Sequence, residues 1–99
     1  MNVYVPEQEK VLAHFGEDAQ SIVHMEECAE LIQAISKMRR ARKEENDDTY
    51  AYYNLVEEMA DVIICLEQMQ LMYGISTCEI QTMIMKKCKR QGERILEHV

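Results

Sequence analysis

Residues 58–66 read E-M-A-D-V-I-I-C-L, a helical stretch in which acidic residues lie among apolar ones. Apolar side chains occupy almost every side of this helix, yet Asp61 stands in their middle and Glu58 lies one turn earlier. A three-residue step turns a helix by about 300°, so both carboxylates lie on one face. An unpaired buried carboxylate is costly, so we expect a cation beside them, either a basic side chain or a metal ion.

The segment H-M-E-E-C-A-E-L over residues 24–31 repeats this arrangement. Glu27 and Glu30 are three residues apart, and Glu26 lies four residues before Glu30, again among apolar neighbours. On two antiparallel helices, these acidic pairs would face a common layer and repel one another unless divalent cations neutralised them. Carboxylate oxygens suit Mg²⁺ or Mn²⁺ rather than Zn²⁺. The alternative is a solvated acidic stripe that pairs with basic residues.

The helix-breaking residues are few, and they divide the chain into helices. Three Gly and one Pro occur, and no alternating strand pattern is visible. Pro6 suits the first turn of a short helix that Gly16 ends. Asp18 then caps a long second helix over about residues 19–42, and residues 43–48 form a charged, polar break.

A third helix follows the break and continues to Tyr73, where Gly74 ends it. Its cap is one of three polar residues, Asp47, Asp48 or Thr49. Between residues 59 and 66 this helix is apolar almost all round, which a two-layer monomer of this size would not cover. We therefore expect self-association.

Ser76 and Glu79 form a capping box, which predicts a fourth helix over about residues 77–98. A chain of 99 residues has room for one core. The sequence therefore predicts an all-α fold, an antiparallel helical bundle, as a single domain over residues 1–99.

Charge and composition exclude several classes of protein. The chain carries 18 acidic and 11 basic residues, a net charge of −7, which argues against general nucleic-acid binding. No apolar run approaches the roughly 20 residues that cross a bilayer, and no signal-peptide pattern is visible, so we expect a cytoplasmic protein without a membrane partner. The Cys residues lack metal-ligand spacing and are expected to be reduced thiols that pack helices. They are Cys28, Cys65, Cys78 and Cys88.

The two acidic segments, E-E-C-A-E at residues 26–30 and E-M-A-D at residues 58–61, resemble the EExxE and ExxD signature of the MazG-like, all-α nucleoside triphosphate pyrophosphohydrolases. The similarity extends from F-G-E-D-A-Q at residues 15–20 to M-K-K-C-K-R-Q-G-E-R-I at residues 85–95. It implies a four-helix core completed by dimerisation or tetramerisation. It also implies Mg²⁺-dependent hydrolysis of a (d)NTP between its α and β phosphates, which yields a nucleoside monophosphate and pyrophosphate.

The same resemblance implies roles for individual side chains. The implied ligands of Mg²⁺, or of Mn²⁺ in its place, are Glu27, Glu30, Glu58 and Asp61. Glu26 would be either a further ligand or the base that orients the attacking water. On the fourth helix, a basic stripe at spacings of three and four residues resembles the phosphate-contacting segment of the family. It consists of Lys87, Arg90 and Arg94, and its alternative role is to stabilise the C-terminus of that helix.

The residues that would contact the base or sugar are less sharply defined. Gln20, His24 and Asn54 lie one or two turns before the acidic residues and are the candidates, although His24 also fits a partly buried, hydrogen-bonded histidine. Nothing in the sequence fixes the base. Sanitation of the nucleotide pool, hydrolysis of phosphoribosyl-ATP and a dUTPase-like activity all stay open within the same superfamily.

Two other classes of protein also use acidic helices. A di-iron or di-manganese carboxylate bundle needs Glu-x-x-His on two helices, and neither acidic segment provides it. A non-catalytic helical interaction module would place its acidic residues on a solvated face, which the apolar neighbours of Asp61 argue against. Such a module would also show no dependence on Mg²⁺.

Overall fold

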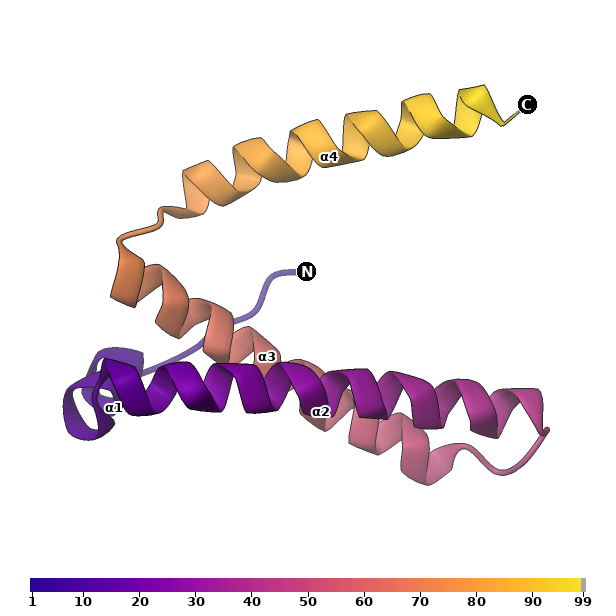
Figure 1. The fold of residues 1–99 in the computed structure, drawn as a ribbon, viewed down its shortest axis with the longest axis horizontal. Coiled ribbons are helices and arrows are strands. Elements are labelled where there is room, and N and C mark those ends of the chain that lie inside the picture. Colours follow the sequence, from indigo (N-terminus) through magenta and orange to yellow (C-terminus); the bar gives the residue numbers. More distant parts are fainter. Residues whose placement is uncertain (99) are drawn as a thin grey trace.

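The computed structural model describes residues 1–98, and most of these residues are helical (Figure 1). Four helices follow one another in the order α1 (Gln8–Phe15), α2 (Glu17–Lys43), α3 (Thr49–Tyr73) and α4 (Thr77–Glu97). No strand occurs within these residues. The predicted all-α fold is therefore confirmed.

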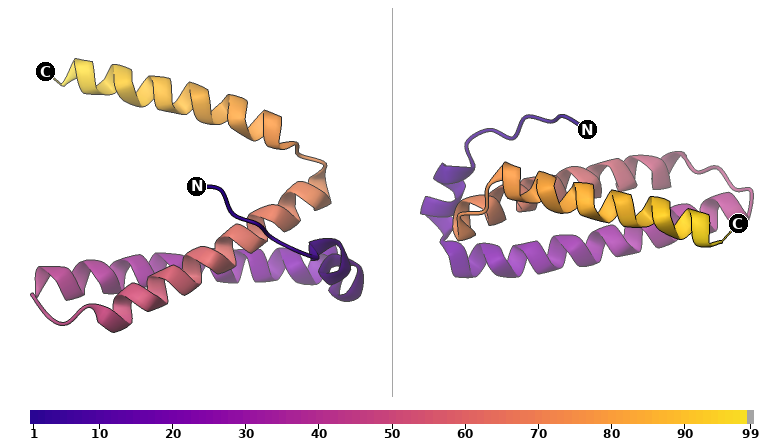
Figure 2. Two further views of the ribbon diagram at one scale, coloured as in Figure 1. Left: turned by 180° about the vertical axis from the view of Figure 1, so that it is seen from behind. Right: turned by 90° about the horizontal axis from the view of Figure 1, so that it is seen from above.

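Helices α2 and α3 form an antiparallel pair, and the short helix α1 lies across one end of it (Figure 1). The extended segment before α1 passes back over α3 (Figure 2). There Val5 and Pro6 line a groove together with Ile63 and Ile64 of α3. The α2–α3 pair is the centre of the fold, because both α1 and the N-terminal segment contact it.

Helix α4 leaves the end of α3 and runs apart from α2 and α3 (Figures 1 and 2). The turn between them is ordered by hydrogen bonds. Gly74 has a left-handed φ of 65°, and the Ile75 N–H donates to the Gln70 carbonyl at 3.0 Å. Ser76 and Glu79 make both bonds of the capping box, so the predicted end of α3 and start of α4 are confirmed.

Two predicted helix starts are wrong. Helix α1 begins at Gln8 rather than near Pro6, because Glu7 has a left-handed φ of 63°, which a right-handed helix does not include. Helix α2 begins at Glu17, so Asp18 lies inside its first turn instead of capping it. A negative charge in the first turn still stabilises the helix through the helix dipole.

The turn between α2 and α3 is held by the acidic residues that follow α2. The Asp47 carboxylate accepts hydrogen bonds from the Thr49 backbone N–H at 3.0 Å and from the Thr49 hydroxyl at 2.6 Å. These bonds lower the pKa of Asp47. Asp48 occupies the N-cap position and instead accepts a bond from Arg42 at 3.0 Å. Of the three predicted caps, Asp47 is the one whose side chain bonds to the first turn of α3.

Very little apolar surface is buried within residues 1–98. The buried apolar residues are all small, and they are Ala34, Ala51 and Cys65. The chain exposes 8159 Å², whereas a compact monomer of this mass exposes about 5,800 Å². Its radius of gyration is 16.9 Å, against about 13 Å for a globular chain of this length. In a single chain, the apolar faces of α3 and α4 are therefore exposed to solvent.

The cysteines differ from one another in burial. All four are free thiols, and Cys65 is buried. The prediction that these thiols pack helices is wrong within a single chain for the other three, which are exposed. They are Cys28, Cys78 and Cys88. No helix among the described residues is long and apolar enough to cross a membrane.

Ala34 is completely buried on α2, so replacing it with a large residue should destabilise the fold. We expect Ala34→Leu to lower the free energy of unfolding by about 1–3 kcal/mol, because the added methyl groups force the helices apart. Urea unfolding followed by circular dichroism measures this. Ala29→Leu, on an exposed position of the same helix, is the control and should change stability little.

Candidate metal centre

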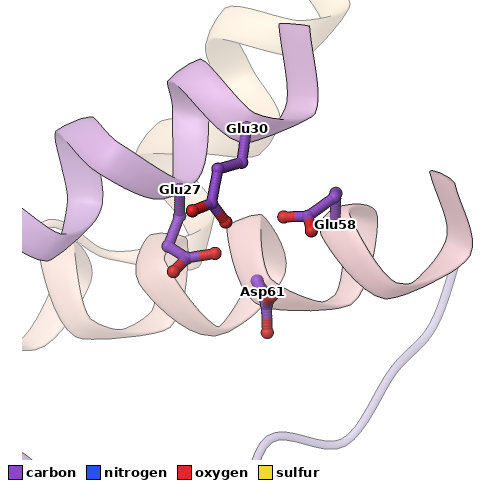
Figure 3. Close-up of side chains that lie close together, drawn as sticks. All are labelled: Glu27, Glu30, Glu58 and Asp61. Atoms are coloured by element: carbon purple, nitrogen blue, oxygen red, sulfur yellow. The ribbon is translucent and has the colours of Figure 1, made fainter. Parts of the chain in front are cut away.

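Four carboxyl groups meet between α2 and α3, two from each helix (Figure 3). Glu27 and Glu30 are on adjacent turns of α2, and Glu58 and Asp61 are on adjacent turns of α3. One oxygen of each carboxyl group lies within 4.8 Å of the corresponding oxygens of the others. The sequence spacing predicted each pair, and the antiparallel packing of the helices brings the two pairs together.

Part of this carboxylate cluster is shielded from water and lacks hydrogen-bond partners. One carboxyl oxygen of Glu27 and one of Glu58 are buried without any donor. Within residues 1–98 the ion pairs are Lys10 with Glu7 and Arg42 with Asp48, and neither involves the cluster. The described chain therefore provides no cation to balance these four carboxylates.

The crowding of like charges changes the acidity of the cluster. Burial, and then the charge of Asp61, raise the pKa of Glu27 from 4.5 to about 7. Burial and the charge of Glu30 also raise the pKa of Glu58. The neighbouring Cys65 thiol has a pKa raised to about 11 by burial, so it stays neutral near pH 7 and adds no negative charge. The cluster is thus an environment that favours protons or metal ions over free carboxylates.

A divalent cation with a preference for oxygen fits this cluster. Four carboxylate oxygens form a hard donor set, and two of the carboxyl groups have buried oxygens without partners. Glu27, Glu30, Glu58 and Asp61 are the residues that would hold this cation.

Several other residues that were predicted for the site lie outside the carboxylate cluster. Glu26 is exposed on α2 and is not among the four converging residues. Asn54 is half-buried on α3, one turn before Glu58. The basic stripe lies on α4, which runs apart from α2 and α3, so a single chain does not bring it to the carboxylates (Figure 1). Its exposed members are Lys87, Arg90 and Arg94.

Gln20 and His24 are buried in a hydrogen-bonded layer beside the cluster. Both bond to the side-chain oxygen of Gln68 on α3, Gln20 through its amide at 3.1 Å and His24 through Nε2 at 2.7 Å. The Gln68 amide in turn donates to Gln8 of α1 at 2.8 Å. Sequence reasoning missed Gln68, although it lies seven residues after Asp61 and so on the same face of α3.

The raised pKa of Glu27 predicts how the metal-free protein responds to pH. The folded state binds more protons than the unfolded state between pH 4.5 and about 7, so the free energy of unfolding should fall as pH rises through this window. Urea unfolding in a chelating buffer, at pH values across the window, measures it. Glu27→Gln should flatten the dependence, and an unchanged slope in this variant would contradict the assignment.

Comparison with known proteins identifies the family of the chain. No curated protein and no solved structure matches the chain. The sequence model of the MazG nucleotide pyrophosphohydrolase domain matches residues 17–95, a range that contains the whole of α2, both acidic pairs and most of α4. Because this match covers most of the chain, the protein belongs to the MazG nucleotide pyrophosphohydrolase family.

Proposed function

We propose that this chain is a Mg²⁺-dependent nucleoside triphosphate pyrophosphohydrolase. It hydrolyses a (d)NTP between the α and β phosphates and releases a nucleoside monophosphate and pyrophosphate. The observation that carries the proposal is the carboxylate cluster, in which four side chains converge, two oxygens are buried without partners, and no cation of the described chain balances the charge.

The proposal gives the side chains of α2 and α3 separate tasks. Glu27, Glu30, Glu58 and Asp61 hold Mg²⁺, or Mn²⁺ in its place. The bound ion supplies positive charge opposite the phosphate oxygens and lowers the pKa of a water molecule. Exposed Glu26 precedes Glu27 and lies one turn before Glu30, and its carboxylate would accept a proton from the attacking water or serve as a further ligand.

In this proposal Asn54 is the main residue that contacts the base or sugar, because it is half-buried one turn from Glu58. Gln20 and His24 would have to give up their bonds to Gln68 to contact a nucleotide, so their positions favour a supporting role. The substrate is an ordinary or damaged (d)NTP removed from the nucleotide pool. Phosphoribosyl-ATP and dUTP are the alternative substrates within the family.

Pyrophosphate release from a panel of NTPs, dNTPs and phosphoribosyl-ATP tests this function. We expect Mg²⁺-dependent release from at least one of them. Asp61→Asn and Glu58→Gln should each lower kcat/KM by about a hundredfold or more, because each removes a ligand from the cluster.

Glu57→Gln is the matched control, since Glu57 is exposed and adjacent to Glu58 but lies outside the cluster. It should retain activity. If no nucleotide is hydrolysed and calorimetry detects no Mg²⁺ binding, the chain is instead the non-catalytic interaction module.

We further propose that the active form is a homo-oligomer in which a second copy covers the apolar faces of α3 and α4. The chain exposes over 2,000 Å² more than a compact monomer of its mass, an excess in the range that stable subunit interfaces bury. Four of the exposed apolar side chains on α4 follow one stripe of the helix, and two others, Met85 and Leu96, lie on its opposite side. The four are Ile80, Met83, Ile84 and Ile95.

The second copy would also bring positive charge to the carboxylate cluster. Lys87, Arg90 and Arg94 lie on the same side of α4 as its apolar stripe, because Lys87 follows Ile80 by seven residues and Arg90 follows Met83 by seven. The acidic cluster on α2 and α3 and the basic stripe on α4 have opposite charges, but within one chain α4 runs apart from α2 and α3 (Figure 2). We therefore propose that α4 of one copy provides the phosphate-binding side chains for the cluster of another.

Mixing two inactive variants tests this arrangement. One variant carries Asp61→Asn, and the other carries Lys87→Ala, Arg90→Ala and Arg94→Ala. After the two chains are unfolded and refolded together, mixed dimers contain one complete site, so about a quarter of the wild-type activity should return. Differently tagged chains verify that mixed oligomers have formed. No recovery in such oligomers would mean that each chain uses its own α4.

A further inference from the structure

The hydrogen-bonded layer of Gln20, His24 and Gln68 is the most completely buried polar group of residues in the described chain. Their exposed fractions are 8%, 4% and 3%. The Gln68 side-chain oxygen can only accept hydrogen bonds, so the His24 Nε2 at 2.7 Å must carry the proton. The Gln68 amide nitrogen donates to Gln8, so the oxygen of the Gln68 side chain is the end that faces α2. All the hydrogen bonds of this layer are thus mutually consistent.

The amide–imidazole layer and the carboxylate cluster are successive layers of one helix interface. Gln20 lies seven residues before Glu27 on α2, and Gln68 lies seven residues after Asp61 on α3. Seven residues are close to two turns, so each pair occupies one side of its helix. Gln20, Gln68, Glu27 and Asp61 also line one cavity of about 130 Å³. The two layers are therefore in direct proximity.

The carboxylate cluster pushes α2 and α3 apart, whereas the amide–imidazole layer holds the two helices together. The carboxylates of Glu27 and Asp61 repel one another across the interface. The bonds from Gln20 and His24 to Gln68 join the same two helices less than two turns away. Hydrogen bonds are directional, so they fix the rotation of each helix as well as the distance between the helices.

We infer that Gln68 is a positioning residue for the carboxylate cluster: by accepting hydrogen bonds from Gln20 and His24, it holds α2 and α3 in the orientation in which the four carboxylates meet. The inference rests on the proposed metal-binding function of the cluster. No hydrogen bond joins Gln68 to a carboxylate of the cluster, so Gln68 acts through the helices that carry these carboxylates.

The substitution Gln68→Met tests this inference, because methionine is also unbranched and of similar size but accepts no comparable hydrogen bond. We expect Mg²⁺ affinity, measured by calorimetry on the full chain without nucleotide, to fall about tenfold, as is typical when the support of metal ligands is removed. Nitrogen NMR should show His24 as the Nε2–H tautomer in the wild type. In Gln68→Met, this single tautomer should be lost.

Gln70→Met is the matched control, because Gln70 is on the same helix and bonds to the Ile75 carbonyl and the Thr77 hydroxyl outside the interface. It should bind Mg²⁺ as the wild type does. If Gln68→Met does not fold, Gln20→Met removes a single donor and should also weaken Mg²⁺ binding. Affinity within about twofold of wild type in the folded variant would overturn the inference, as would the Nδ1–H tautomer of His24.

The outcome also separates this inference from the proposed function. A wild-type chain that binds no Mg²⁺ would contradict the proposed function itself. Mg²⁺ binding by the wild type that is equally strong in Gln68→Met would leave the proposed function intact and overturn the positioning role alone.

Discussion

The structure depends on keeping four carboxylates close together between α2 and α3. Like charges repel strongly where water is excluded, and one oxygen of Glu27 and one of Glu58 are in such places. The helices stay together because attractive contacts act elsewhere in the pair. The buried Ala34 and Ala51 lie on the same two helices beyond Glu30 and Glu58, and the layer around Gln68 lies beyond Glu27 and Asp61. The carboxylates are thus flanked by attractive contacts on both sides.

Most features that depend on neighbours in the sequence were predictable. Gly74 ends α3 and the Ser76–Glu79 capping box starts α4, because both signals act within a few residues. The two acidic pairs were predictable for a similar reason, since helical periodicity alone fixes the relative directions of side chains three residues apart. Only the meeting of the pairs required a tertiary assumption, and the short break between α2 and α3 made antiparallel packing the simplest one.

Features that depend on contacts distant in the sequence were not predictable. A glutamine such as Gln68 is as common on an exposed helix face as in a buried network, and only its partners on α1 and α2 distinguish the two. The direction of α4 was also not predictable, although the residues that set it are close in the sequence. The capping box sets where the helix begins, but the angle at which it leaves α3 is set by the whole turn, including the Gln70 side chain. The start of α2 was misjudged because Asp18 fits the first helical turn as well as a cap.

The distribution of polar and apolar residues links the proposed chemistry to the proposed association. A helix pair that uses its inner face for carboxylates cannot use the same face for the apolar burial that stabilises most domains. The apolar burial must then come from the outer faces of α3 and α4, which a single chain leaves exposed. The placement of the basic stripe follows the same reasoning. A lysine or arginine between α2 and α3 would pair with the carboxylates and compete with a metal ion, whereas the proposed phosphate-binding residues Lys87, Arg90 and Arg94 are on the separate helix α4 and do not pair with them.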